Sequence, residues 1–238
     1  MDDHYGRPPE GYWRPSYFEL VPDHSEREIN TAKSLLNFQP GMMALDIGAG
    51  IGKAMVSLSA AGFDVTGIEP STPFRDKAIE HMGIASGRIA HTSIEAAEFP
   101  GDSFDFITFG AVLEHLYDPA GSIEKAMRWL RPGGVMQIEV PSSNHLVAKF
   151  INLYNRLRGV NYVTHLSPMH SPFHLYEFDL ATFAMHAQSH GYAVVKYTYE
   201  VCSVYKIPKV FHRPLKWWME RHNSGMQLVV WLRKLPAA

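Results

Sequence analysis

The 238-residue chain has 22 Lys and Arg against 24 Asp and Glu, a formal net charge of −2, with 46% hydrophobic and 19% charged residues. These values are ordinary for a globular protein of one large domain, or one domain with an appendage, and they give no global electrostatic case for nucleic-acid binding. One cysteine, Cys202, excludes an intrachain disulfide and a cysteine-based zinc site, which favours a reducing, cytoplasmic setting. The polar N-terminus shows no signal peptide and no run of 18 apolar residues occurs, so we expect no transmembrane segment.

The first 22 residues are predicted to form an aromatic arm. Residues 1–20 contain three prolines, which argue against a regular element, and five aromatic side chains: Tyr5, Tyr12, Trp13, Tyr17 and Phe18. Chain termini are usually mobile unless they are tied down, but five aromatics are unusual for a disordered tail. A frayed arm and a packed lid over a site are the two alternatives, and we favour the lid.

A helix is predicted after the arm. Asp23 with Glu26 three residues later is a start of the capping-box type. Apolar residues then recur at helical spacing until Pro40-Gly41, at Ile29, Ala32, Leu35 and Leu36.

The stretch Met42–Lys53, MMALDIGAGIGK, carries the strongest signal. An apolar run over 42–47 predicts a buried strand, and it ends at three glycines on alternate positions, Gly48, Gly50 and Gly52. A glycine turn lets backbone N–H groups approach a ligand where a Cβ would collide. The helix expected over about 52–61 points its N-terminus at the same place.

Two classes of ligand would suit this turn. A dinucleotide fingerprint, G-x-G-x-x-G, needs its third glycine where Lys53 stands, so that fingerprint fails. The pattern is instead D-x-G-x-G-x-G, with Asp46 ahead of the first glycine. A carboxylate there would repel a pyrophosphate and attract a ligand that carries an ammonium group. A glycine-rich turn with no ligand is the structural alternative.

A second acid, Glu69, follows the strand predicted over Asp64–Ile68. Neighbouring parallel strands end at one crevice, where a carboxylate can accept hydrogen bonds from both hydroxyls of a ribose. The ribose of NAD would be bound equally well, and a surface acid that starts a loop is the other alternative. Ser71 or Thr72 then caps a helix that reaches about residue 82, with Pro73 in its first turn.

Strands are predicted over Arg88–Thr92 and Phe104–Phe109, the second a nearly continuous apolar run of the kind found in central parallel strands. Gly110-Ala111-Val112-Leu113-Glu114-His115 follows. Together with the glycine turn and Glu69, this stretch resembles the class I S-adenosylmethionine-dependent methyltransferases. The Glu114-His115 pair is similar to the "EH" pair of their small-molecule, ubiquinone-biosynthesis-like group.

The resemblance implies a set of cofactor-binding residues. Tyr17 would cover the cofactor, Asp46 would hold its amino acid part directly or through water, and Glu69 would bind its ribose. Many members carry an acid for the adenine amino group where Ser93 stands here, so that contact falls to Ser93 or to the N–H of Ile94. The full set is Tyr17, Asp46, Gly48, Ala49, Gly50, Glu69, Pro70, Ser93, Ile94, Gly110, Val112 and His115.

The alternation of strands and helices predicts a doubly wound parallel sheet. A helix after Asp118-Pro119 is expected to stop at Arg131–Gly134, before a strand over Val135–Val140. Asp179 caps a later helix that ends by Gly191, and strands follow over Ala193–Val201 and Gln227–Arg233. The resemblance implies a seven-stranded, mostly parallel Rossmann-like sheet over 23–238, with an antiparallel last strand inserted beside strand Val135–Val140 and helices on both faces.

Residues 142–175 interrupt the alternation at the carboxyl edge of the sheet, where loops usually choose the substrate. A short helix is expected there, with four histidines around it: His145, His165, His170 and His174. No acid falls among them at ligand spacing, so we predict no metal site and favour a pocket lining. His115 and His174 are the candidate general bases, and each has the alternative role of shaping the pocket.

Residues 205–225 are basic and aromatic. Such a segment can dock on an anionic membrane or an acidic partner. The alternative that we favour is a long hairpin or dimer contact that buries its tryptophans.

These features predict a cytoplasmic S-adenosylmethionine-dependent methyltransferase that acts on a small-molecule acceptor. We favour methylation of an oxygen or nitrogen atom over methylation of carbon. We expect a monomer or homodimer with no nucleic-acid partner, and the segments 142–175 and 205–225 on the acceptor side. The competing functions are an NAD-type oxidoreductase and a non-catalytic S-adenosylmethionine-binding protein.

Overall fold

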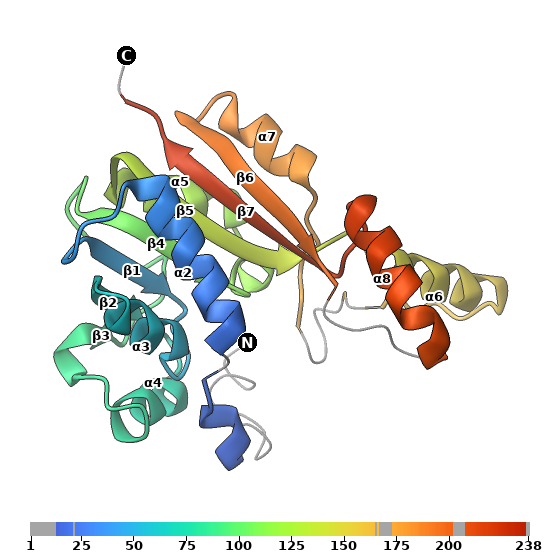
Figure 1. Ribbon diagram of the computed structural model, residues 1–238, viewed down its shortest axis with the longest axis horizontal. Coiled ribbons are helices and arrows are strands. Elements are labelled where there is room, and N and C mark those ends of the chain that lie inside the picture. The colour runs from blue at the N-terminus through green and yellow to red at the C-terminus, as the bar shows by residue number, and fades with distance from the viewer. Residues whose placement is uncertain (1–12, 21, 165, 167–172, 202–207, 237–238) are drawn as a thin grey trace. The chain divides into compact units, whose positions relative to one another are not determined.

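The structure, a computed structural model, describes residues 13–20, 22–164, 166, 173–201 and 208–236. Seven strands form one sheet in the order β3-β2-β1-β4-β5-β7-β6, with β7 antiparallel (Figure 1). This confirms the predicted seven-stranded Rossmann-like sheet. The chain divides into two compact units, one of residues 1–110, 120–137 and 233–238 and one of residues 111–119 and 138–232.

The first unit holds the parallel strands that meet at the glycine turn. Strand β1 pairs in parallel with β2 on one side and β4 on the other. Figure 1 shows α2 and α3 on one face of these strands and α5 on the other, so the strands are covered on both faces and read as apolar runs. The elements of this unit are η2 (Pro15–Phe18), α2 (Pro22–Leu36), β1 (Met43–Ile47), α3 (Lys53–Ala60), β2 (Asp64–Ile68), α4 (Thr72–Glu80), η3 (Ser86–Arg88), β3 (Ile89–Ala90), β4 (Phe104–Gly110) and α5 (Pro119–Trp129).

A buried polar chain crosses the core of the first unit. Gln137 of β5 (Leu130–Pro141) donates from Nε2 to the Glu28 carboxylate of α2 at 3.0 Å, and its Oε1 accepts from the Thr108 hydroxyl of β4. Gln137 and Thr108 are buried, and a buried polar group without a hydrogen-bond partner is destabilising. The two hydrogen bonds therefore satisfy the Gln137 amide and the Thr108 hydroxyl. These bonds fix α2 against the sheet.

The second unit contains the remaining elements and its own core. Helix α7 packs on β6, and Asp179 caps α7 by accepting from the N–H of Thr182 at 2.9 Å, as expected. Phe183, Tyr192 and Met219 are fully buried here. The elements are η4 (Leu113–His115), α6 (Leu146–Leu157), α7 (Leu180–Ala187), β6 (Tyr192–Glu200), η5 (Lys209–Phe211), α8 (His212–Arg221) and β7 (Gln227–Lys234).

Three local predictions are wrong. Helix α2 begins at Pro22, so Asp23 lies inside its first turn and not ahead of it. Strand β5 starts at Leu130, directly after α5, so the expected stop at Arg131–Gly134 lies within the strand, where Gly133 has a φ of +80°. The segment expected as a hairpin forms η5 and α8, since its apolar residues repeat at helical rather than alternate spacing. Among the described residues, none of the helices is long and apolar enough to cross a membrane.

Candidate functional site

The glycine turn after β1 uses its own backbone donors. The N–H groups of Gly48 and Ala49 both donate to the carbonyl of Ile68, at 2.9 and 3.0 Å. Gly52 donates to the carbonyl of Ala49 at 2.8 Å, and Gly50 donates to the Glu69 carboxylate at 2.7 Å. The expectation that these amides face a ligand is therefore wrong for all four. Phosphate sites at such turns depend on free amides, so the turn does not fit a pyrophosphate.

Two glycines of the turn have different tasks. Both have positive φ, +55° at Gly50 and +81° at Gly52. A Cβ at Gly52 would collide with the side chain of Ile84, so Gly52 lets the start of α3 pack closely. A Cβ at Gly50 would meet nothing within 4 Å. Gly50 therefore borders open space, where a ligand can approach the backbone.

Asp46 lies in β1, two residues ahead of the first glycine, and is only 4% exposed. Its Oδ2 atom has no hydrogen-bond partner in the part of the chain that the structure describes. Burial, and second the nearby Glu69 carboxylate, raise the pKa of Asp46 from 3.8 to about 7. A buried carboxylate whose oxygen lacks a hydrogen-bond partner favours a cationic or hydrogen-donating ligand, because such a ligand would supply the partner.

Glu69 is held at the end of β2 by two backbone amides. Its Oε2 accepts from Gly50 and its Oε1 from Ser71, each at 2.7 Å. Burial raises the pKa of Glu69, while these two amides and His91 oppose the rise. Each carboxylate oxygen can accept more than one hydrogen bond, so both retain capacity for hydroxyl donors. The position at a strand end, read from the sequence, is confirmed, and the two amide donors could not be read from it.

The end of β3 adjoins Glu69 and the residue after it. The N–H of Glu69 donates to the carbonyl of Ala90 at 3.0 Å, and His91 Nε2 lies 2.8 Å from the carbonyl oxygen of Pro70. Ile94 is buried, and the hydroxyl of Ser93 accepts from the N–H of Ala96 at 3.4 Å. His91 directly follows β3, which is shorter than the strand predicted over Arg88–Thr92, and that prediction placed His91 inside the strand and gave no sign of its role.

The described part of the arm lies against the same unit. The ring of Tyr17 lies under Lys53, with Nζ 5.0 Å from the ring centroid, at the first residue of α3. Trp13 packs against Phe74 of α4, with ring centroids 5.4 Å apart. Residues 13–18 therefore contact the helices that follow the glycine turn and Glu69. The predicted lid over 1–22 is consistent with these contacts, and its residues 1–12 and 21 lie outside the described part.

Strand β4 ends at Gly110, where a Cβ would meet nothing within 4 Å. The next residue, Ala111, has a φ of +55°, which is rare for a residue with a side chain and concentrates at functional sites. Its N–H donates to the carbonyl of Glu139 at 3.0 Å. Val112 then precedes the short helix η4 that carries Glu114 and His115.

Glu114, His115 and His174 form a cluster in the second unit, which we call the acid–histidine cluster. Glu114 Oε1 lies 3.9 Å from His174 Nε2, and the two histidine rings have centroids 5.0 Å apart. Glu114 is 2% exposed, and burial, with the Glu139 charge as the lesser cause, raises its pKa to about 8. Its backbone carbonyl accepts from the N–H of Leu175 at 2.8 Å, which ties the two segments together.

The proton positions on His115 follow from its partner. Its Nδ1 lies 3.3 Å from the carbonyl oxygen of Phe173, an atom that can only accept, so Nδ1 carries the proton. Nε2 is then the basic nitrogen of the ring. Phe173 itself has a φ of +59°, a conformation that residues with side chains seldom adopt. The structure thus brings the two histidines predicted from the sequence into one cluster. It adds Glu114, which the sequence indicated only as a member of the Glu114-His115 pair.

The acid–histidine cluster also has the donor set of a metal site. One ligand atom from each of its three residues lies within 4.8 Å of the others. No acid falls among the histidines of 142–175 at ligand spacing in the sequence, but the fold brings Glu114 to His174. Of the other histidines named above, His145 is buried, and His165 and His170 lie outside the described residues.

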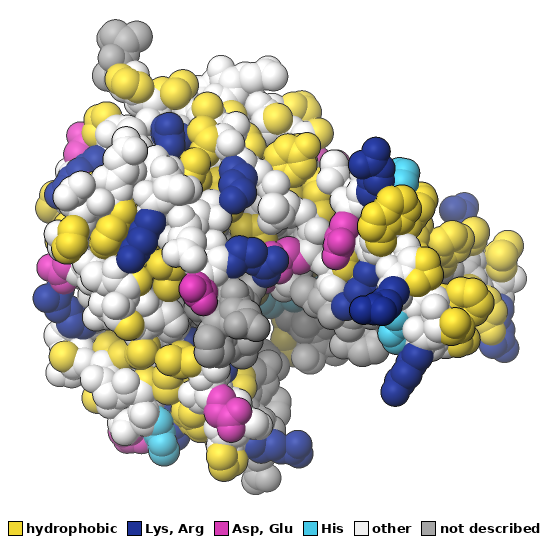
Figure 2. Space-filling model, viewed as in Figure 1, with side chains coloured by type: hydrophobic (Ala, Val, Ile, Leu, Met, Phe, Trp, Pro, Cys, Tyr) yellow, Lys and Arg dark blue, Asp and Glu magenta, His cyan; other side chains and the backbone are white. Residues whose placement is uncertain are grey.

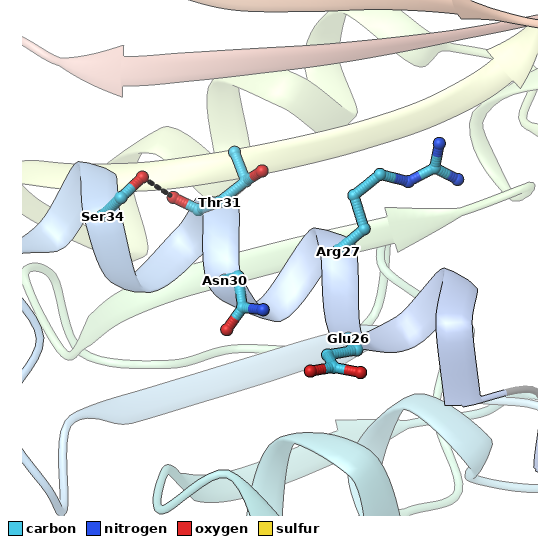
Figure 3. Close-up of a pocket in the computed structure, with 5 residues that line it drawn as sticks. All are labelled: Glu26, Arg27, Asn30, Thr31 and Ser34. Atoms are coloured by element: carbon cyan, nitrogen blue, oxygen red, sulfur yellow. Dashed lines mark hydrogen bonds between the residues drawn. The ribbon is translucent and has the colours of Figure 1, made fainter.

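A separate groove runs along α2 (Figure 3). It is lined by Glu26, Arg27, Asn30, Thr31 and Ser34, and the hydroxyl of Ser34 donates to the carbonyl of Thr31 at 2.8 Å. This bond is local to the helix, and the lining includes none of the predicted cofactor or base residues. We therefore assign the groove no part in the site.

The chain matches a family model described as a methyltransferase domain over residues 23–197. It is 31% identical over 131 residues to a ubiquinone biosynthesis O-methyltransferase from Aromatoleum aromaticum, covering 54% of each chain. It is 32% identical over 120 residues to a phosphoethanolamine N-methyltransferase from Triticum aestivum, covering 46% of this chain and 23% of that one. The chain thus spans about half the length, or less, of these curated relatives.

Solved structures agree on the fold. The YcgJ protein from Bacillus subtilis superposes with a TM-score of 0.62 at 18% identity, over 91% of this chain and 100% of that one. A putative sarcosine dimethylglycine methyltransferase from Galdieria sulphuraria gives a TM-score of 0.60 at 16% identity, over 90% and 84%.

Proposed function

The chain belongs to the class I S-adenosyl-L-methionine-dependent methyltransferase family, and we propose that it methylates a small-molecule acceptor, at oxygen or nitrogen rather than at carbon. The observation that carries the proposal is the buried Asp46, whose Oδ2 has no partner among the described residues, beside a turn whose amides are already used. Similarity to an O-methyltransferase and to an N-methyltransferase supports the class of acceptor.

The residues of the first unit fit S-adenosyl-L-methionine. Asp46 is suited to an ammonium group, the two oxygens of Glu69 to the paired hydroxyls of a ribose, and Gly50 to close approach. We assign Tyr17 to the cover of the site and Ser93 or the backbone N–H of Ile94 to the adenine. Gly48, Ala49 and Pro70 shape the turn and the strand end, and Gly110 and Val112 line the start of η4.

When bound, the cofactor supplies an electrophilic methyl group on a sulfonium, so the protein needs no covalent nucleophile. The chain's task is to hold the acceptor in line and to exclude water. We assign the acceptance of the acceptor's proton to Nε2 of His115, because its Nδ1–H donates to the carbonyl of Phe173. Burial raises the pKa of Glu114 to about 8, so its carboxyl is protonated and neutral at pH 7, with Oε1 3.9 Å from His174 Nε2.

The remaining assignments belong to the same proposal. We assign residues 1–22 to a lid and 23–238 to the methyltransferase domain, with 142–175 and 205–225 on the acceptor side. The base is either His115 or His174, and an acidic acceptor such as a phenol needs neither. A monomer or homodimer in the cytoplasm stays our prediction.

Two titrations test the proposal against its competitors. S-adenosyl-L-methionine and NAD are titrated by calorimetry into the wild type and into Glu69→Ala. We expect the methyl donor to bind the wild type, to bind Glu69→Ala at least ~10-fold more weakly, and NAD not to bind. Binding of NAD in place of the methyl donor would favour the oxidoreductase.

Turnover then separates an enzyme from a binding protein. A panel of phenols, carboxylates and amines is assayed for methyl transfer, and His115→Ala and His174→Ala are compared with the wild type on any acceptor found. Loss of a general base costs about 10²–10⁴-fold in rate. Tight cofactor binding with no turnover on the panel would favour the non-catalytic alternative. Near-full rates in both variants would exclude both histidines as the base.

A further inference from the structure

Helix α6 carries an apolar stripe that the second unit leaves in solvent. Phe150, Leu153, Tyr154 and Leu157 recur at helical spacing and are 64%, 53%, 57% and 78% exposed. Val147 and Ala148, at the start of the helix, are buried. A helix in a globular protein normally turns such a stripe to its own core. Here the stripe faces outward, so another apolar phase is its natural partner.

A second apolar group lies on η5 and α8. Val210, Phe211, Trp217 and Trp218 are 75%, 56%, 63% and 40% exposed, and Met219 anchors α8 by being fully buried. A hairpin in which the chain itself buries these tryptophans is therefore wrong, and a dimer contact that buries them stays a prediction. The start of α6 is tied to the end of this segment, since the N–H of Leu146 donates to the carbonyl of Ser224 at 3.2 Å. The two groups thus belong to one part of the second unit.

Basic residues surround both groups. The stretches 146–164 and 208–225 hold seven Lys and Arg against a single acid, Glu220, whereas the rest of the chain holds 15 basic and 23 acidic residues. Figure 2 shows dark blue basic side chains among the yellow apolar ones over α6 and α8. The basic residues are Lys149, Arg156, Arg158, Lys209, Arg213, Lys216 and Arg221. We call these side chains and the eight exposed apolar ones the basic–aromatic surface.

One pair shows how a cation and an apolar ring share this surface. Arg158 donates to the hydroxyl of Tyr154 at 2.9 Å, and its guanidinium carbon lies 5.6 Å from the centroid of the same ring. Amphipathic side chains of this kind place an apolar body in hydrocarbon and a polar tip at headgroup level. Helices that lie in a membrane interface combine a wide apolar face with Lys and Arg on the polar face.

We propose that the basic–aromatic surface docks the protein on an anionic lipid bilayer. Charge complementarity selects this occupant. The surface has an excess of six positive charges on a chain whose net charge is −2, so a second copy bound face to face would bring like charges together. An anionic bilayer offers both the negative headgroups and the apolar phase. The docking requires neither the cofactor nor an acceptor, so its test is independent of the test of methyl transfer.

Vesicle co-sedimentation of the full chain tests the proposal. Vesicles of phosphatidylcholine alone are compared with vesicles of phosphatidylcholine and phosphatidylglycerol. We expect binding to the second kind only, weakened by added salt because exposed charges are screened. Arg213→Glu with Lys216→Glu should weaken it by ten-fold or more, since each basic residue near an anionic surface contributes about five-fold. Leu153→Ser with Leu157→Ser should weaken it while leaving its salt dependence.

Matched controls come from the same unit. Met185→Ser removes an apolar side chain that is 70% exposed on α7, and Lys196→Glu reverses an exposed charge on β6. Both should bind as the wild type does, and circular dichroism should show all variants folded.

Three results would overturn the docking. The first is equal binding to both kinds of vesicle, or binding to neither. The second is a loss of vesicle binding in the control variants as large as that in the test variants. The third is a concentration-dependent dimer that Leu153→Ser with Leu157→Ser converts to a monomer. The last would show that the surface joins two copies of the chain.

Discussion

Replacing Asp46 by Asn tests the site most directly, because the change removes one charge and almost no volume. Burial and the Glu69 charge raise the pKa of Asp46 from 3.8 to about 7. Without cofactor the carboxyl is therefore protonated below about pH 7, whereas an ammonium group binds its ionised form. As pH increases towards 7, the affinity of the wild type for the cofactor should therefore increase by up to ~10-fold per pH unit. Above pH 7 the affinity should level off.

The same shift fixes the sign of the effect on stability. An acid whose pKa is raised by folding binds its proton more tightly in the native state, so its contribution to stability falls as pH rises from about 4 to 7. About three pKa units at ~1.4 kcal/mol each give ~4 kcal/mol as the upper limit. Asp46→Asn removes this dependence, so the cofactor-free variant should be more stable than the wild type at pH 7.5. Urea unfolding at pH 5 and pH 7.5 measures both free energies of unfolding.

Calorimetry with S-adenosyl-L-methionine between about pH 5 and 7.5 measures the affinity, since an α-amino group with a pKa of about 7.7–8.0 stays mostly protonated over this range. At pH 7.5 we expect Asp46→Asn to bind about 10- to 100-fold more weakly than the wild type, the value of a hydrogen bond to a charged group, with little pH dependence. Asp76→Asn makes the same change at a half-exposed position of α4 in the same unit, and it should bind as the wild type does. Wild-type affinity that stays constant over this range, or an Asn variant with unchanged affinity, would refute the reasoning.

Other predictions concern the turn and the cluster. Glu69→Gln places an amide NH₂ against one of its two backbone donors, so we expect about 10-fold or greater loss of cofactor affinity by calorimetry, and unchanged affinity would contradict the ribose assignment. Gly52→Ala forces a Cβ against Ile84 at positive φ and should destabilise the fold by about 2–4 kcal/mol in urea unfolding. Gly50→Ala, at positive φ but facing open space, should cost only ~1–2 kcal/mol and mainly weaken cofactor binding; equal destabilisation by the two variants would contradict the different tasks assigned to them. Chelation with EDTA should leave turnover unchanged if the acid–histidine cluster acts through proton transfer, and lost activity that returns with a divalent ion would make the cluster a metal site.

The sequence predicted β1, β2 and β4 of the first unit well because they are central and parallel, whereas the edge strand β3 is shorter than predicted. Strand β2 has the predicted bounds, and β1 and β4 differ from prediction by one residue at one end. A strand that is covered on both faces must be apolar throughout, and such a run needs no tertiary information to be recognised. Asp46 and Glu69 stood out for the same reason, since an acid at the end of an apolar run has to be explained.

The second unit was harder to predict because its contacts join distant segments. His115 meets Phe173 across 58 residues, and neither stretch alone shows that His174 lies beside Glu114. The bounds of β5 depended on a bend at Gly133, and the sequence pattern predicted a turn there. The segment 205–225 was predicted as a hairpin or dimer contact from its basic and aromatic composition, which does not show which side of α8 packs, whereas the structure shows that Met219 is buried.

The glycine turn shows why the type of cofactor cannot be read from glycines alone. Its glycines allow a backbone to approach a ligand of either class, yet the amides of Gly48, Ala49 and Gly50 are all bonded within the protein. What the turn offers is the pair of buried acids beside it, one held by two amides and one with an oxygen that lacks a partner. Such a site repels phosphate at any pH where either acid is ionised, and it attracts an ammonium group when Asp46 is ionised. Selectivity for a positively charged cofactor over a dinucleotide thus follows from how the backbone donors are used, and the pH dependence of binding is the property by which that selectivity can be measured.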